Sequence, residues 1–257
     1  MQTRNFKFII SYDGTRYFGW EHQPNTELTI QGKLERVLTE MHQAEHGAPP
    51  EKPIVVIGAG RTDAGVSARA MTANALLDTA KSEVEIQQYM NRYLPEDISV
   101  SEVRQAADRF HSRFKAVGKT YRYTLWYSGD GTKPVFDRKY VYVLEEKPDL
   151  ARMEEAAARL CGMHDYRSFC GNPHIKKSTV RVVDTIRIET SGRYIRLYFH
   201  GNGFLQNMVR IMTGTLLECG YGKIRPDEID DILKARDRKR AGFTAPACGL
   251  CLMKVDY

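Results

Sequence analysis

An acidic residue, Asp63, lies in a glycine-rich stretch that also contains an arginine, a combination that could act on a bound ligand. The stretch at 60–66 reads GRTDAGV and follows an apolar run at 54–57. Because glycine adopts backbone dihedrals that other residues avoid, such a loop can bring the carboxylate of Asp63 and the guanidinium of Arg61 close to a ligand. The alternative is a strand-to-strand connection in which Asp63 caps a turn and Arg61 is solvated.

Two further residues stand in settings that favour a function. Arg210 lies within the apolar sequence MVRIM at 208–212, which disfavours a fully solvated position on a helix, and a buried guanidinium requires a carboxylate partner. Tyr121 alternates with Lys119 and Tyr123 along a predicted strand, so the three side chains share one face. The alternative for Tyr121 is ordinary packing, since half-buried strands are rich in tyrosine.

The stretch at 60–66 is similar to the catalytic loop of the TruA family of tRNA pseudouridine synthases. Further matches to that family occur in order along nearly the whole chain: YDGT at 12–15, FGW at 18–20, QG at 31–32, KTYRY at 119–123, GFL at 203–205, MVR at 208–210, TAPA at 244–247 and GL at 249–250. One motif alone could arise by chance, whereas this ordered series indicates a relationship over most of the sequence.

The resemblance implies an isomerase that uses neither a cofactor nor a metal. It implies conversion of uridine to pseudouridine at positions 38, 39 and 40 of the anticodon arm of tRNA, by a homodimer. Asp63 is then the nucleophile, attacking either the ribose C1′ or the uracil ring, and Arg210 forms an ion pair with it. A neighbouring guanidinium favours the ionised carboxylate that this role needs.

The resemblance also implies which residues bind the substrate. Tyr121 stacks on the target uracil, and its hydroxyl helps in the late proton transfer from C5. Leu250 closes the pocket as an apolar wall, for which core packing is the alternative. Arg61 contacts the RNA backbone and the flipped nucleotide, and Lys119 lies on the strand face of Tyr121.

Three positions depart from the pattern of the family. Glu21 follows the Trp of the FGW motif where many members have Gln, Ser67 stands where many have His, and Phe243 precedes TAPA where Arg is frequent. None of the three is a proposed nucleophile, stacking Tyr or paired Arg. The three departures instead bear on the contacts with RNA and on the range of uridines that are modified.

Composition points to a globular protein of the cytoplasm. The 257 residues are 42% apolar, yet no apolar run approaches the roughly 20 residues of a membrane span, and the first residues lack the apolar centre of a signal peptide. Five cysteines at irregular spacing favour a reducing compartment. Cys248 and Cys251 have the spacing of half a zinc site, but no second pair completes it, so we expect no metal.

The net charge of +6 favours a polyanionic partner, and the cations are clustered. One cluster at 109–119 has Phe110 and Phe114 among its basic residues and Tyr121 just beyond them, a mixture suited to phosphates and stacked bases. Other clusters occur at 176–181 and at 234–240. The last of these is equally well explained as the solvated end of a helix.

Hydrophobic periodicity predicts an α+β protein built from two βαββαβ-like halves of the split βαβ type. Each half has an antiparallel mixed sheet with helices on its outer face, and the resemblance implies that the two sheets meet, with an active-site cleft between the halves. The predicted halves are 1–107 and 108–257. The predicted strands are 6–12, 54–57, 70–78, 98–105, 120–127, 140–143, 180–190, 194–200 and 249–255, and the predicted helices are 30–43, 84–94, 149–160, 205–219 and 226–235. Residues 128–138 are expected to connect a hairpin.

Two other functions are consistent with a basic, cofactor-free protein. A catalytically silent RNA-binding relative would need the cations but not an ionised Asp63 among phosphates. An unrelated hydrolase could use Asp63 as its nucleophile, but no metal-binding or phosphate-binding motif accompanies that residue. Mapping of pseudouridine in tRNA after incubation with the protein distinguishes the three.

Overall fold

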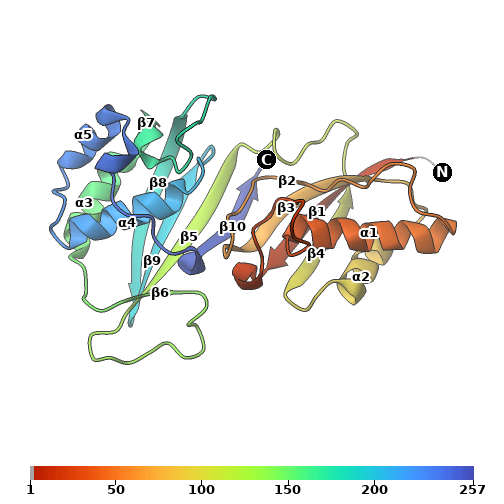
Figure 1. The fold of residues 1–257 in the computed structure, drawn as a ribbon, viewed down its shortest axis with the longest axis horizontal. Coiled ribbons are helices and arrows are strands. Elements are labelled where there is room, and N and C mark those ends of the chain that lie inside the picture. The colour runs from red at the N-terminus through yellow and green to blue at the C-terminus, as the bar shows by residue number, and fades with distance from the viewer. Residues whose placement is uncertain (1–2) are drawn as a thin grey trace. The chain divides into compact units, whose positions relative to one another are not determined.

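The computed structural model describes residues 3–257, and within them ten β-strands and five α-helices form an α+β fold. This confirms the predicted fold class. The strands and helices gather into two compact units (Figure 1). Unit 1 comprises the chain up to Ala116 together with Leu252–Tyr257, and unit 2 comprises Val117–Cys251.

Unit 1 contains paired strands with two helices, and β1 runs antiparallel to both of its neighbours, β3 and β4. The strands follow the order β4-β1-β3-β10, and the short strand β2 pairs with β3. Helix α2 contacts β4 and also the neighbouring α1. The elements are β1 (Arg4–Tyr12), α1 (Ile30–His46), β2 (Ile57–Gly58), β3 (Ser67–Leu77), α2 (Glu83–Tyr93), β4 (Ile98–Gln105) and β10 (Leu250–Asp256).

The sequence of unit 1 explains these elements locally. Along β1, Phe6, Phe8 and Ile10 are fully buried at every second position, as expected for a strand with one face on the core. Helix α1 is capped by Thr29, whose side chain accepts a hydrogen bond from the backbone of the first turn, and α2 begins with a capping box between Ser82 and Glu85. These caps satisfy backbone donors that a helix end leaves unpaired.

Unit 2 contains a second run of paired strands and three helices. Its strands follow the order β5-β9-β8-β7, and β6 pairs with β5 in parallel. Helix α3 contacts α4, α5 and β8, and α4 is buried along most of its length. The elements are β5 (Gly118–Tyr127), β6 (Tyr142–Leu144), α3 (Leu150–Leu160), β7 (Gly162–Asp165), β8 (Val180–Ser191), β9 (Tyr194–Gly201), α4 (Met208–Gly220) and α5 (Glu228–Ala235).

Several predicted elements change when the structure is compared with the sequence. The predicted strand 54–57 is reduced to β2, and β7 was not predicted. Helix α4 begins at Met208 rather than at 205, because Asn207 has a left-handed backbone with φ 59°. From Leu252 onward the last strand belongs to unit 1, whereas the predicted division into 1–107 and 108–257 places it in the second half. Strand pairing of this kind depends on residues distant in sequence.

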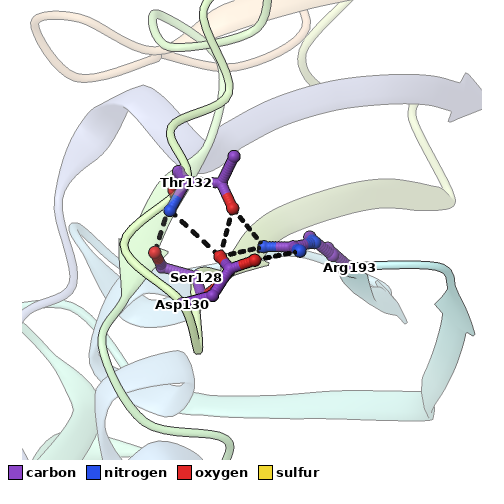
Figure 2. Close-up of polar contacts among 4 residues, drawn as sticks. All are labelled: Ser128, Asp130, Thr132 and Arg193. Carbon is purple, nitrogen blue, oxygen red and sulfur yellow. Dashed lines mark hydrogen bonds and ion pairs between the residues drawn. The ribbon is translucent and has the colours of Figure 1, made fainter.

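The expected hairpin at 128–138 is wrong, because β5 and β6 run parallel. Their connection is instead a long loop tied to the turn between β8 and β9 (Figure 2). The guanidinium of Arg193 donates to both carboxylate oxygens of Asp130 at 2.6 Å, to the hydroxyl of Thr132 at 2.6 Å and to the carbonyl of Ser128 at 2.8 Å. The hydrogen bonds from Arg193 hold the pKa of Asp130 well below its ordinary value.

Candidate active site

The loop that carries Asp63 is bonded to the segment that follows β1. The backbone N–H of Trp20 donates to the carbonyl of Thr62 at 3.1 Å. The hydroxyls of Thr62 and Tyr12 form a buried hydrogen bond of 2.8 Å. Trp20 belongs to the FGW motif and Tyr12 to the YDGT motif. Thr62, the residue immediately before Asp63, is therefore held by one backbone and one side-chain hydrogen bond to these motifs. Asp63 itself is half-buried.

The residues that follow Asp63 are held in the same way. Gly65 has φ 79°, a left-handed conformation that a glycine adopts without strain, and its N–H donates to the carbonyl of Tyr17 at 3.2 Å. The hydroxyl of Ser67 accepts a hydrogen bond from the N–H of Gly14 at 3.0 Å. Ser67, one of the departures from the family pattern, therefore has a structural role in closing this loop.

The FGW motif lies directly against the Asp63 loop. Gly19 has φ 97°, and a Cβ at this position would lie 2.6 Å from the carbonyl oxygen of Thr62. A larger residue would therefore displace the loop. The motif and the glycine-rich stretch, which are separated by about forty residues in the sequence, form one structural element.

Arg61 is on the solvent side of the loop and forms an ion pair with Glu21. Both side chains are more than one third exposed, so the pair contributes little to stability. The Gln-to-Glu departure at this position thus gives Arg61 an acidic neighbour. An RNA phosphate would have to compete with that neighbour for Arg61.

Arg210 lies in the first turn of α4 and is half-buried. Its Nε donates to the carbonyl of Ala245 at 2.7 Å, and its Nη1 donates to Oδ1 of Asn207 at 3.0 Å. The N–H of Ala245 donates in return to the carbonyl of Arg210 at 3.1 Å. The guanidinium is therefore oriented by the structure, in contrast to a solvated cation on a helix surface.

Asn207 was not identified from the sequence. A left-handed asparagine three residues before an arginine, at the start of a helix, is the signal that points to it. Non-glycine residues in this conformation are concentrated at functional sites.

The remaining predicted residues of unit 2 lie on β5 and at the start of β10. Tyr121 is 8% exposed, and its ring meets that of Phe204 edge to face with centroids 5.3 Å apart. The hydroxyl of Tyr123 donates to the carbonyl of Pro246 at 2.7 Å, which ties β5 to the segment that holds Arg210. Leu250 is buried at the start of β10, and Lys119 is half-buried on β5.

The predicted site residues are thus divided between the two units. Unit 1 carries Asp63 and Arg61 on one anchored loop. Unit 2 carries Arg210, whose guanidinium can pair with a carboxylate, and Tyr121, whose ring can stack on a base. Lys119 and Leu250 also belong to unit 2.

The basic clusters differ in how many of their cations already contact partners within the protein. Arg236 forms an ion pair with Asp165, and Arg238 donates to backbone carbonyls and to Thr244, so the cluster at 234–240 is partly structural. Burial lowers the pKa of Arg238. By contrast, Lys176 and Lys177 are exposed, as are several cations at 109–115.

Two negative findings apply to residues 3–257. No three His, Cys, Asp or Glu side chains in this part of the chain are grouped as metal ligands would be. None of the described helices combines the length and the apolar composition that crossing a membrane requires.

Comparison with known proteins identifies the protein family of this chain. A family model described as tRNA pseudouridine synthase matches residues 8–115 and 156–257. The chain belongs to this family.

Similar proteins cover its whole length. It is 44% identical to a tRNA pseudouridine synthase A of Bacillus sp. (strain KSM-64), over 98% of this chain and 99% of the relative. It is 40% identical to a tRNA pseudouridine synthase A of Acetivibrio thermocellus and 38% identical to a tRNA pseudouridine synthase A 2 of Clostridium perfringens, in both cases over 99% of this chain and 100% of the relative. The resemblance found in the sequence motifs is confirmed.

Proposed function

We propose that this chain isomerises uridine to pseudouridine at positions 38, 39 and 40 of the anticodon arm of tRNA, with Asp63 as the nucleophile. Family membership makes it an isomerase that acts on tRNA. The observation that carries the proposal is the position of Asp63, half-buried on a loop whose two sides are bonded to the 12–20 segment. A side chain presented in this way is positioned to react repeatedly with the same atom of a substrate.

The reaction breaks the bond from uracil N1 to the ribose C1′ and forms a bond from C5 to C1′. The base loses a proton from C5 and gains one at N1, so no electrons are transferred and no co-reactant is consumed. Asp63 attacks either the ribose C1′ or the uracil ring and is released when the C5 bond has formed. The proposal gives Arg210 the role of keeping the carboxylate ionised and oriented.

The other proposed residues hold the substrate. Tyr121 stacks on the target uracil, and its hydroxyl assists removal of the C5 proton. Leu250 forms an apolar wall, while Arg61 and Lys119 contact the RNA. Extrusion of a base from a stem costs a few kcal/mol, which contacts with phosphates can offset.

We also propose that the enzyme works as a homodimer in the cytoplasm. The dimer follows from the family resemblance, in which one tRNA contacts both subunits. Light scattering of the purified protein tests it: a mass of one chain at working concentration, with full activity, contradicts the dimer.

The test of the function is release of tritium from tRNA labelled at uridine C5, followed by mapping of pseudouridine. Product at positions 38 to 40 supports the proposal. Binding of tRNA without tritium release identifies a catalytically silent RNA-binding protein instead. Absence of both would contradict an action on tRNA.

A further inference from the structure

The segment at 107–115 presents one exposed aromatic ring between two exposed cations. The side chain of Phe114 is 79% exposed, and its neighbours Arg113 and Lys115 are exposed as well. The other aromatic residues of this basic cluster are covered: Phe110 lies against Tyr257 with centroids 5.2 Å apart. Single exposed apolar side chains are common on protein surfaces, so the case depends on how this ring is held.

The ring of Phe114 is positioned before any ligand binds. It stacks on His111, with ring centroids 4.1 Å apart and an angle of 28° between the planes. The backbone N–H groups of Phe114 and Lys115 donate to the carbonyl of His111 at 3.1 and 3.0 Å, and that of Arg113 donates to its Nδ1 at 3.2 Å. One face of the ring is therefore covered while the rest is in solvent. A preorganised ring loses little conformational entropy when a second ring stacks on it.

A buried polar network fixes this turn to the sheet of unit 1. Oδ1 of Asn74 accepts hydrogen bonds from the N–H and the hydroxyl of Ser112 at 2.9 and 2.8 Å. Nδ2 of Asn74 donates to Asn5 at 3.1 Å, and Asn5 donates to the carbonyls of Ala107 and Phe110 at 3.0 and 2.9 Å. Buried amides are costly unless their hydrogen bonds are made. These residues are bonded, so the turn is a rigid extension of β1 and β3.

The cations beside the ring are unpaired. Within residues 3–257, Arg109, Arg113 and Lys115 form no ion pair with a carboxylate. Aromatic rings interleaved with unpaired cations are typical of surfaces that bind unpaired nucleotides, because the ring stacks on the base while the cations contact the phosphates. A protein partner would need more apolar area than one ring offers.

We propose that Phe114 is a stacking platform for an unpaired base of tRNA other than the uridine being modified, with Arg113 and Lys115 contacting the phosphates beside that base. The inference rests on the proposed function only in naming tRNA as the ligand. It requires neither Asp63 to be the nucleophile nor any particular target position.

The experiment measures tRNA binding in the Asp63→Asn background, so that no turnover occurs. Phe114→Leu should weaken binding about tenfold, because stacking on an aromatic side chain is lost. The slope of log affinity against log salt should stay the same, because the phosphate contacts remain. Arg113→Gln should lower that slope by about one. Tyr93→Leu, which removes another exposed aromatic side chain of unit 1, is the matched control and should bind as the parent does.

A fluorescent variant reports stacking directly. Phe114→Trp should bind tRNA and should show quenching that the parent, with only Trp20 and Trp126, does not show. Equal affinity of Phe114→Leu and the parent, or an unquenched Phe114→Trp that binds tRNA, overturns the platform while leaving the proposed function intact. A parent that binds no tRNA overturns both. Melting curves of each variant identify any loss of folding, and the fluorescence of Phe114→Trp provides the decision if Phe114→Leu unfolds.

Discussion

Arg210 and Asn207 are joined by a hydrogen bond of 3.0 Å between Nη1 and Oδ1, and they lie three residues apart at the start of α4. Asn207 reaches this position only in a left-handed conformation, in which its side chain turns toward the first turn of the helix. With the carbonyl of Ala245 bonded to Nε, the guanidinium is held on two sides. We therefore expect Asn207 to position Arg210.

Replacing Asn207 should slow catalysis with little effect on tRNA binding. Hydrogen bonds to charged groups contribute about 1.5–3 kcal/mol, so Asn207→Gly should lower kcat by about tenfold or more, with KM nearly unchanged. Glycine retains the left-handed backbone, so this variant removes the amide alone. Steady-state kinetics measure the effect, and a kcat equal to that of the unsubstituted enzyme would show that the bond does not matter.

Asp63→Asn should abolish turnover while tRNA affinity changes little. The amide keeps the shape of the carboxylate but cannot act as its nucleophile, and phosphate contacts dominate binding. Tritium release from C5 measures turnover, and filter binding measures affinity. Thermal unfolding of the Asp63→Asn variant serves as the control for folding of this loop. Retention of a tenth of the activity in Asp63→Asn would exclude the nucleophilic role.

Two substitutions of Tyr121 separate its ring from its hydroxyl. Tyr121→Phe should bind tRNA normally and turn over slowly, with an enlarged isotope effect from deuterium at C5, because the ring remains and the hydroxyl is lost. Tyr121→Leu should also bind more weakly, by roughly 1–3 kcal/mol. If only the Leu variant fails, the ring is a platform without a role in proton transfer. If both variants match the unsubstituted enzyme, Tyr121 is a packing residue.

Tyr12→Phe should destabilise the Asp63 loop. The substitution removes one partner of the buried hydrogen bond between Tyr12 and Thr62, and an unsatisfied buried hydroxyl costs about 1–3 kcal/mol. Thermal unfolding should shift down by a few degrees, and kcat should fall because the residue beside Asp63 loosens. A variant with unchanged melting and unchanged kcat would contradict this account of the loop. Thr62→Val provides the reciprocal test from the other partner.

The tie between Asp130 and Arg193 should persist across neutral and mildly acidic pH. The pKa of Asp130 is lowered in the folded protein, so the stabilisation is complete above the ordinary carboxyl pKa and is lost only as the pH falls through the lowered value. Cleavage of the 128–140 loop by trypsin after Arg138 or Lys139 should therefore be slow and nearly constant between about pH 6 and 8, once corrected for the protease's own pH dependence. Asp130→Asn should accelerate it, whereas Asp149→Asn, at the N-cap of α3, should not.

Much of the protein was determined by the sequence alone. Alternating apolar residues in β1 and a helical apolar stripe in α1 predicted those elements, because both patterns are local consequences of backbone geometry. The GRTDAGV stretch, with its ordered companion motifs, identified the family and the catalytic carboxylate to be tested. The predicted bounds of the second helix, 84–94, were also close to those of α2, Glu83–Tyr93.

How these elements contact one another depends on the tertiary structure. Phe110 and Phe114 are four residues apart in one basic segment, yet one is packed on Tyr257 and the other is exposed, because their burial depends on the distant chain terminus. Asn207 contacts Arg210 because of the way the chain enters α4, and β10 pairs with β3 of unit 1. Such contacts join residues far apart in the chain, so no local pattern encodes them, and they form only when the whole core is packed.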